Sequence, residues 1–170
     1  PDFYPLYSMR QYAYNNIKQH NRNLLLGRDP TVDGMKTGYT EAAGYCLVTS
    51  AVRDTPAGKR RLLSVVMGTA SREARAAESQ KLLNYGFQFF SSHRVYAKGQ
   101  TVSNLPVWKG KEKTLKTGVS QDLLLTLPKG HYSRVKASVT SKQPLLAPIS
   151  AGQAVGTLRL TLDDKPLAEY

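Results

Sequence analysis

Apolar and β-branched residues are concentrated in two runs in the first half of the chain. Residues 44–52 read G-Y-C-L-V-T-S-A-V and residues 60–68 read R-R-L-L-S-V-V-M-G, and both runs are typical of β-strands. Between them, D-T-P-A-G supplies the proline and glycine of a loop. Two strand-like runs joined by such a loop predict an antiparallel hairpin.

The spacing of apolar residues changes to that of a helix after Ser71. Ser71 is a favourable N-cap, and Glu73 places negative charge in the first turn, where it interacts well with the helix dipole. The apolar residues at helical spacing are Ala76, Leu83, Phe87 and Phe90. This pattern predicts an amphipathic helix from about Arg72 to Phe90, whose aromatic end packs in the core.

Beyond Ser92, apolar and polar residues alternate with a period of two. This alternation is clear in residues 134–139 and 157–162, and turn signals occur at residues 128–130, 148–152 and 163–166. Short strands with one solvated face predict a small β-sandwich. We therefore predict an α+β chain with a boundary near residue 92, which separates residues 1–92 from residues 93–170.

Residues 1–30 show neither pattern. Several aromatic residues precede the polar run N-N-I-K-Q-H-N-R-N at positions 15–23. We expect extended or looping chain here, lying over a larger body. The single cysteine, Cys46, excludes an internal disulfide and lies in an apolar run, so we interpret it as a small buried hydrophobic residue and not a reactive thiol.

Composition and charge narrow the possible functions. A hydrophobic content of 41% argues for a globular chain and against disorder. The formal net charge of +12 is spread along the chain without a recognition-helix or stacking-aromatic motif, so we expect no nucleic-acid partner. The histidines, His20, His93 and His131, lack ligand spacing, and we expect no metal or other cofactor. The sequence also lacks an apolar run of membrane-spanning length and the features of a signal peptide.

The triplet K-T-G occurs twice, at residues 36–38 and at residues 116–118. A lysine and a hydroxyl beside a strand edge can bind a carboxylate, and the glycine allows an extended peptide to approach the backbone. The first triplet lies in D-G-M-K-T-G-Y-T, directly before the predicted hairpin. The second follows a polar, lysine-rich connection, and we interpret it as a turn with a solvated Lys116.

The surroundings of the first triplet carry a longer match. N-R-N-L-L-L precedes it, V-D-G-M-K-T-G-Y-T-E-A-A-G-Y-C-L-V-T-S-A spans it, and V-V-M-G-T-A-S-R-E-A-R-A-A-E-S-Q-K-L-L-N-Y-G-F-Q-F-F follows it. These segments resemble the D-alanyl-D-alanine carboxypeptidases, the low-molecular-mass penicillin-binding proteins of the serine peptidase type. The resemblance covers essentially the whole chain. It implies part of a penicillin-binding domain, of the β-lactamase/transpeptidase-like fold, in residues 1–92, followed by a β-sandwich domain in residues 93–170.

The resemblance also implies roles for individual residues. Lys36 would organise the electrostatics of a confined cleft and help to move protons among the catalytic groups. Thr37 and Arg75 would bind the terminal carboxylate of D-Ala-D-Ala or of penicillin, and the backbone N–H of Tyr39 would be an oxyanion-hole donor. The implied substrate-binding residues are Lys36, Thr37, Gly38, Thr40 and Arg75. The family often has histidine in place of Tyr39, which affects side-chain contacts but not the main-chain donor.

The family's other two motifs, S-x-x-K and S-x-N, supply the nucleophile and proton-transfer groups. Neither occurs in a convincing position, and the family order places both before residue 1. We therefore expect a fragment of an ordinary enzyme that cannot be acylated alone and that needs the missing N-terminal part of its catalytic domain.

For the complete protein, the resemblance implies a serine-type carboxypeptidase that removes the terminal D-Ala from pentapeptide stems of peptidoglycan and is acylated by β-lactam antibiotics. It further implies a periplasmic location, peripheral on the inner membrane through a C-terminal amphipathic helix that residues 1–170 do not contain. One alternative is a non-catalytic peptidoglycan-binding or scaffolding module. A third reading is a β-lactamase of the same fold.

Overall fold

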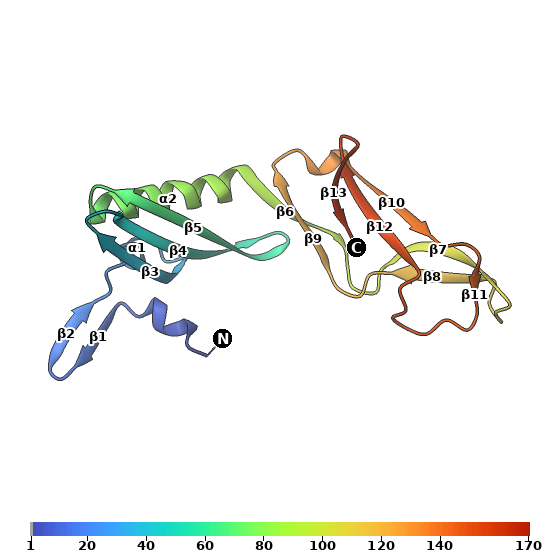
Figure 1. Ribbon diagram of the computed structural model, residues 1–170, viewed down its shortest axis with the longest axis horizontal. Helices are drawn as coiled ribbons and strands as arrows, with labels where there is room; N and C mark the ends of the chain where they lie inside the picture. Colours follow the sequence, from blue (N-terminus) through green and yellow to red (C-terminus); the bar gives the residue numbers. More distant parts are fainter. Residues whose placement is uncertain (1) are drawn as a thin grey trace. The chain divides into compact units, whose positions relative to one another are not determined.

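The computed structural model describes residues 2–170, which form two compact units divided between Phe90 and Ser91 (Figure 1). The elements of the first unit are the 3₁₀-helix η1 (Tyr4–Ser8), β1 (Gln11–Tyr14), β2 (Ile17–His20), α1 (Leu25–Arg28), β3 (Val32–Thr40), β4 (Gly44–Thr55), β5 (Gly58–Thr69) and α2 (Arg72–Phe89). The elements of the second are β6 (Phe90–Tyr96), β7 (Thr101–Trp108), β8 (Thr114–Gly118), β9 (Leu123–Pro128), η2 (Tyr132–Arg134), β10 (Val135–Ser141), β11 (Leu145–Leu146), β12 (Gly156–Leu162) and β13 (Lys165–Glu169).

Strands β3, β4 and β5 form an antiparallel sheet with β4 in the centre. The β4–β5 pair confirms the predicted hairpin, although both strands extend further towards the turn than the apolar runs indicate. Helix α2 packs along β4 and β5 on one face of the sheet. The core of this unit consists of Leu25, Leu26, Val32, Leu47, Ala51, Ala76 and Leu83. It therefore lies between α2, α1 and the covered face of the sheet.

Helix α2 begins and ends close to its predicted bounds. The hydroxyl of Ser71 accepts a hydrogen bond of 3.0 Å from the Ala74 N–H, which confirms the predicted N-cap. At the other end, Phe87 packs against the core, but Tyr85 and Phe89 are 55% and 50% exposed. Of the two aromatic residues on the predicted apolar face, Phe87 therefore packs against the core as expected, whereas Phe90 is half-buried.

The N-terminal segment contains more regular structure than the sequence analysis expected. Strands β1 and β2 pair as a hairpin, with Tyr14 opposite Ile17. The two turn residues, Asn15 and Asn16, have φ angles of 48° and 61°. Both lie in the left-handed region, which asparagine tolerates and which two-residue hairpin turns require because it matches the strand twist. The strands agree with the expected extended chain, but their pairing was not predicted because this turn signal was overlooked.

The second unit is built of strands, as predicted. Its strands form three short sheets, in the orders β10-β12-β13, β11-β7-β8 and β6-β9. Leu123 of β9 and Leu158 and Leu160 of β12 form the buried centre. The alternation predicted for residues 157–162 is confirmed by Leu158 and Leu160, which are 6% and 0% exposed, while Arg159 between them is exposed.

We predict that the two units unfold in separate transitions. Leu83→Ala and Leu160→Ala each open a cavity in a different core and should lower the stability of their own unit by about 2–5 kcal/mol. Hydrogen exchange resolved by peptide, followed through a urea titration, measures each unit separately. The exposed leucines Leu82 and Leu124 are matched controls, and their alanine variants should change stability by no more than about 0.5 kcal/mol. If either core variant moved both transitions equally, the predicted domain division would be wrong.

Candidate active site

Strand β3, which contains the first K-T-G triplet, is an edge strand of its sheet. Within residues 2–170 it pairs with β4 alone, so its other edge has no partner strand. An edge strand presents N–H and C=O groups that can pair with an extended peptide. The triplet therefore lies on a surface suited to binding a peptide in strand conformation.

Lys36 and Thr37 project to opposite faces of the sheet, because successive residues of a strand alternate. Thr37 is half-buried and lies opposite the core residue Leu47, on the face that α2 covers. Lys36 lies opposite Val48 on the uncovered face. Its side chain is exposed, and its Nζ donates a hydrogen bond of 2.7 Å to the Thr37 carbonyl oxygen. The ammonium is thus accessible from the uncovered face.

The end of β3 is exposed from Gly38 to Thr40. The Tyr39 ring packs against Tyr45, with 4.3 Å between ring centroids, and the Thr40 hydroxyl accepts a hydrogen bond of 3.0 Å from the Ala43 N–H. Cys46, expected to be buried, is only half-buried. It pairs with Gly38, which has no side chain to cover it.

Arg75 of α2 reaches the same end of β3. Its side chain is among the most buried polar groups, with 3% of the residue exposed. The guanidinium donates hydrogen bonds to the carbonyl oxygens of Gly38 (3.1 Å), Cys46 (3.4 Å) and Arg22 (3.2 Å). It therefore connects the helix to β3, to β4 and to the segment that precedes α1.

Two further arginines, Arg72 and Arg22, lie close enough to Arg75 to affect its pKa. Burial lowers the pKa of its guanidinium, and the positive charges of Arg72 and Arg22 lower it further. The pKa of an arginine starts so high that the group stays charged. Three of the five hydrogen bonds that a guanidinium can donate are made to the main chain.

The groups that fix the start of β3 were not predicted from the sequence. Asp33 accepts hydrogen bonds from the Arg61 guanidinium (2.8 Å) and from the Tyr4 hydroxyl (3.0 Å). Burial acts to raise the pKa of the Asp33 carboxyl, but these hydrogen bonds outweigh it and hold the pKa below its ordinary value. The D-G dipeptide before the triplet was the only signal in the sequence, because Tyr4 and Arg61 are distant along the chain.

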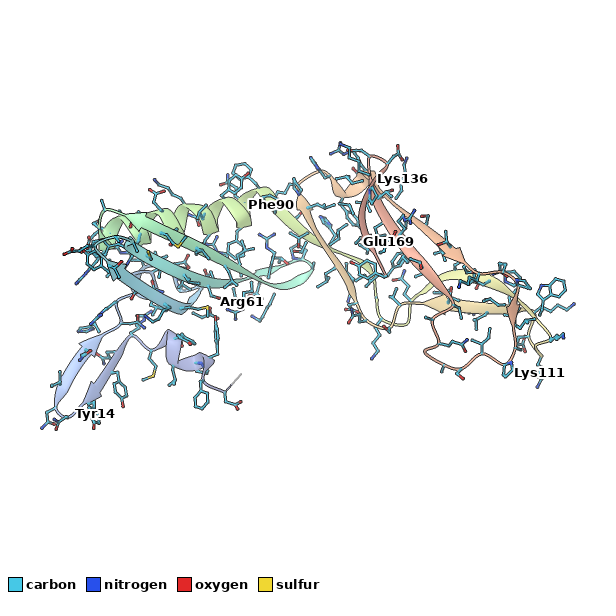
Figure 2. All side chains as sticks on the ribbon, in the orientation of Figure 1. Tyr14, Arg61, Phe90, Lys111, Lys136 and Glu169 are labelled. Atoms are coloured by element: carbon cyan, nitrogen blue, oxygen red, sulfur yellow. The ribbon has the colours of Figure 1, made fainter. Side chains whose placement is uncertain are left out.

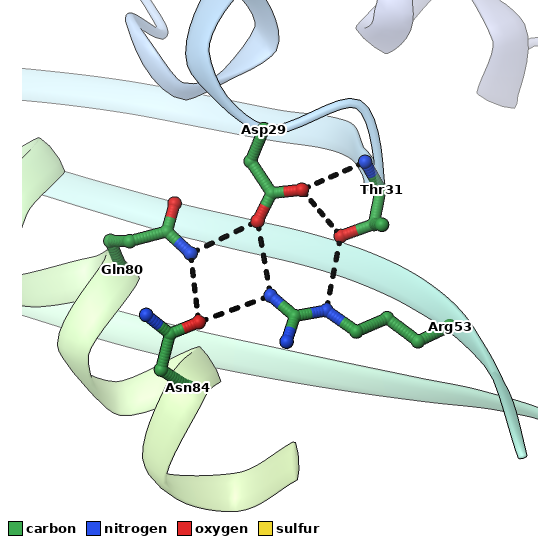
Figure 3. Close-up of polar contacts among 5 residues, drawn as sticks. All are labelled: Asp29, Thr31, Arg53, Gln80 and Asn84. Carbon is green, nitrogen blue, oxygen red and sulfur yellow. Dashed lines mark hydrogen bonds and ion pairs between the residues drawn. The ribbon is translucent and has the colours of Figure 1, made fainter. Parts of the chain in front are cut away.

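A second polar network anchors the connection between α1 and β3 (Figure 3). The Asp29 carboxylate accepts hydrogen bonds from the guanidinium of Arg53 (3.1 Å) and from the amide of Gln80 (2.9 Å). The same guanidinium donates to the Asn84 side chain at 3.1 Å and lies 4.3 Å from the centre of the Phe87 ring. Strand β4, helix α2 and the start of β3 are therefore joined by one arginine.

The second K-T-G triplet does not form the predicted turn. Residues 116–118 are the end of strand β8, where Asn104 of β7 pairs with Lys116 and the Thr117 hydroxyl donates to the Ser103 carbonyl at 2.9 Å. The turn prediction failed because the polar composition of the segment hid a two-residue alternation. The predicted exposure of Lys116 is confirmed.

An S-x-x-K spacing that the sequence analysis missed occurs at Ser133 and Lys136. Ser133 is exposed in η2, whereas Lys136 lies in β10 and pairs with Asp164 at 2.9 Å. The motif needs both side chains on one helical face so that the lysine can take the serine proton. A serine in a 3₁₀ turn and a lysine engaged on a strand do not meet that requirement.

Within the described part of the chain, no group of three or more histidine, cysteine or acidic side chains lies close enough together to hold a metal ion. None of the helices in residues 2–170 combines the length and apolar character needed to cross a membrane.

The chain belongs to the D-alanyl-D-alanine carboxypeptidase family of penicillin-binding proteins. Residues 1–71 match the family described as D-alanyl-D-alanine carboxypeptidase, and residues 90–170 match the C-terminal domain of penicillin-binding protein 5. The α+β architecture, with a partial penicillin-binding domain and a β-domain, is that of the family, as the resemblance implied.

Individual relatives agree with this assignment. The D-alanyl-D-alanine carboxypeptidase DacA of Escherichia coli is 40% identical over 99% of this chain, and the Haemophilus influenzae DacA is 41% identical over 99%. Crystal structures of penicillin-binding protein 5 from Haemophilus influenzae match 98% of this chain at 41% identity, with a TM-score of 0.83. The structure of penicillin-binding protein 6B from Escherichia coli matches all of it at 33% identity, with a TM-score of 0.68.

The chain spans only part of these relatives. It covers 41% of the Escherichia coli DacA and 42% of the Haemophilus influenzae DacA. It covers 48% and 43% of the two solved chains.

The Asp33–Arg61 pair predicts a pH dependence of stability. A carboxyl whose pKa is lowered by folding stabilises the protein above its unfolded pKa of about 3.9, and this contribution disappears as pH falls through the folded value. Asp33→Asn should therefore lower the free energy of unfolding by about 1 kcal/mol at pH 7, a value that allows for solvent screening of the pair. The difference from the natural chain should shrink below pH 4.

Urea unfolding at a series of pH values measures this effect. The matched control is Asp54→Asn, because the Asp54 side chain is 83% exposed and pairs with the equally solvated Lys59. The control should be almost neutral at every pH. A constant difference between Asp33→Asn and the natural chain across the acid range would show that its carboxylate charge is unimportant.

Proposed function

We propose that the full-length protein is a serine-type D-Ala-D-Ala carboxypeptidase that trims the pentapeptide stems of peptidoglycan and is acylated by β-lactams. The observation that carries this proposal is the convergence of an edge strand bearing Lys36 and Thr37 with the buried guanidinium of Arg75 at Gly38. A free strand edge suits an extended peptide, and fixed positive charge at its end suits a terminal carboxylate.

The proposed reaction has two steps. A serine hydroxyl attacks the carbonyl carbon of the penultimate D-Ala, the terminal D-Ala leaves with the transferred proton as a free amino acid, and water then hydrolyses the ester. Thr37 and Arg75 bind the terminal carboxylate, and Gly38 and Thr40 belong to the strand that pairs with the substrate. The N–H of Tyr39 donates to the oxyanion, and Lys36 stabilises developing negative charge and assists proton transfer.

The serine and its lysine are proposed to come from the rest of the catalytic domain, which would cover the open face of the sheet. On that face, three residues of β5 are exposed: Leu63 (62%), Val65 (60%) and Met67 (73%). Lys36 projects to the same face, because it pairs with Val48 of β4, which in turn pairs with Val65. Exposed apolar side chains grouped on one strand face normally have a packing partner. Their burial beside Lys36 would supply the water-excluding cleft that the reaction needs.

The proposed setting follows from the substrate. Peptidoglycan lies outside the inner membrane, so the enzyme acts in the periplasm, and we propose peripheral attachment to the outer surface of that membrane. The reaction requires no metal or organic cofactor.

The two K-T-G lysines provide a direct test of the proposed active site. In the full-length protein, Lys36→Ala should slow acylation by fluorescent penicillin by about 10²–10³-fold, the usual effect of removing a preorganised charge from an active site. Lys116→Ala is the matched control and should acylate normally, because Lys116 is exposed on the β-domain. Equal acylation rates in the two variants would remove β3 from the active site. Absence of labelling in the unmodified protein would favour the non-catalytic alternative.

Arg75 can be tested through the substrate group that it is proposed to bind. Arg75→Ala should lower kcat/KM for peptides ending in D-Ala-D-Ala by roughly 10- to 100-fold, the effect of one charge-assisted hydrogen bond. Peptides with an amidated C-terminus should lose much less. Arg72→Ala is the control, because Arg72 is a neighbouring arginine whose side chain is exposed. If carboxylate and amide substrates lost activity equally, Arg75 would only hold the backbone of Gly38, Cys46 and Arg22 in place.

A further inference from the structure

The β7–β8 hairpin of the second unit and the adjacent strand β11 carry a set of exposed apolar and basic residues. We call this set the tip patch, and it consists of Trp108, Lys109, Lys111, Lys113, Lys116 and Leu146. Figure 2 labels Lys111 in the connection between β7 and β8. None of these residues belongs to the first unit, in which the proposed catalytic residues lie.

The backbone holds the apolar members of the tip patch together. Leu146 of β11 pairs with Trp108 of β7, and the Ala147 N–H donates to the Trp108 carbonyl at 3.0 Å. Paired residues on neighbouring strands project to the same face of a sheet. Their neighbours Val107 and Leu145 are half-buried on the inner face, whereas Trp108 and Leu146 are 62% and 55% exposed. Two large apolar side chains therefore lie side by side in solvent.

The lysines of the tip patch follow Trp108 closely along the chain, and all of them are exposed. The Val107 N–H donates to the Lys113 carbonyl at 2.9 Å, which closes the loop that carries Lys109 and Lys111. Within residues 2–170, none of the four lysines of the tip patch forms an ion pair, and Glu112 is the only acidic residue between positions 109 and 116. The patch thus combines two exposed apolar side chains with lysines that have no ion-pair partner in the described chain.

We propose that the tip patch binds the surface of a bilayer that contains anionic phospholipids. Tryptophan has an amphipathic ring that is favourable at the depth of lipid headgroups, and lysines near an anionic surface each add attraction. The indole of Trp108 and the side chain of Leu146 enter the headgroup region, while the lysines contact lipid phosphates. A soluble polyanion would account for the lysines but would leave the exposed apolar pair without a partner.

Lipid binding by the tip patch depends on the proposed function in one respect only, namely that the protein works close to a membrane. Vesicle binding involves no catalytic step, so the proposal and the carboxypeptidase assignment can fail independently.

Trp108 provides a local probe, because it is the only tryptophan in the chain. On addition of vesicles of mixed phosphatidylglycerol and phosphatidylcholine, its emission should shift to the blue and become protected from acrylamide. Pure phosphatidylcholine vesicles should produce a much smaller change, and added salt should weaken the binding. The local probe is needed because other apolar residues, such as Met67, are also exposed and could adsorb to lipid.

Charge-matched variants separate the tip patch from the general positive charge of the chain. Replacing Lys109, Lys111 and Lys113 together by glutamine should lower the vesicle partition coefficient at least about tenfold, since each lysine near the surface contributes roughly fivefold. The control is the triple glutamine variant at Lys98, Lys129 and Lys165, three exposed lysines of the same unit outside the tip patch.

Three results would overturn the proposal. The first is equal loss of binding in the two triple variants, which would mean that net charge alone attracts the chain to lipid. The second is sedimentation with vesicles without a shift in Trp108 emission. The third is binding to soluble polyglutamate as tight as to the anionic vesicles, which would identify a polyanion as the partner.

Discussion

The candidate active site depends on one buried arginine that substitutes for missing backbone pairing. Within the described residues strand β3 has a partner strand on one side only, and the end of an edge strand is free to fray. The guanidinium of Arg75 binds the carbonyls of Gly38 and Cys46 on neighbouring strands and that of Arg22 on a third segment. A charged donor held by three acceptors in a low-dielectric environment fixes this end of the strand more firmly than a neutral side chain would. The edge of β3 that does not pair with β4 can therefore remain open while the strand keeps its conformation.

The two polar networks at the other end of β3 serve the same need. Asp33 is held by Arg61 and Tyr4, and Asp29 by Arg53 and Gln80. In both networks an aspartate, within β3 (Asp33) or shortly before it (Asp29), pairs with an arginine of the β4–β5 hairpin. Such anchoring should increase the affinity of the strand for substrate. The substrate then pairs with a preformed edge, and the protein loses less conformational entropy on binding.

Sequence patterns predicted the elements that are determined by residues close together in the chain. The β4–β5 hairpin follows from two apolar runs and a turn, and the start of α2 follows from the hydroxyl of Ser71. The β1–β2 turn at Asn15 and Asn16 was also local and could have been recognised. The contacts of Arg75 and Arg61 were beyond such patterns, because their partners lie far away in sequence and become neighbours only through the sheet. The resemblance to a family suggested a role for Arg75, but not that its guanidinium is largely occupied by the main chain.

The two K-T-G triplets show how little a three-residue motif determines. Both lie on strands, and both lysines are exposed. In the described chain both triplets also lie on edge strands, and Lys36 differs because the charged guanidinium of Arg75 reaches the end of its strand. The substrate binding proposed for the first triplet therefore depends on the groups around it and not on the three residues alone.

Strand β5 combines an apolar outer surface with a second unpaired edge in the described chain. Surfaces of this kind allow copies of a chain to join strand to strand. The exposed cationic side chains at the start of β5, Lys59 and Arg61, are paired with Asp54 and Asp33 and add little local repulsion. Repulsion between copies of residues 1–170 therefore comes from the net charge of +12 of the whole chain, and high ionic strength screens it.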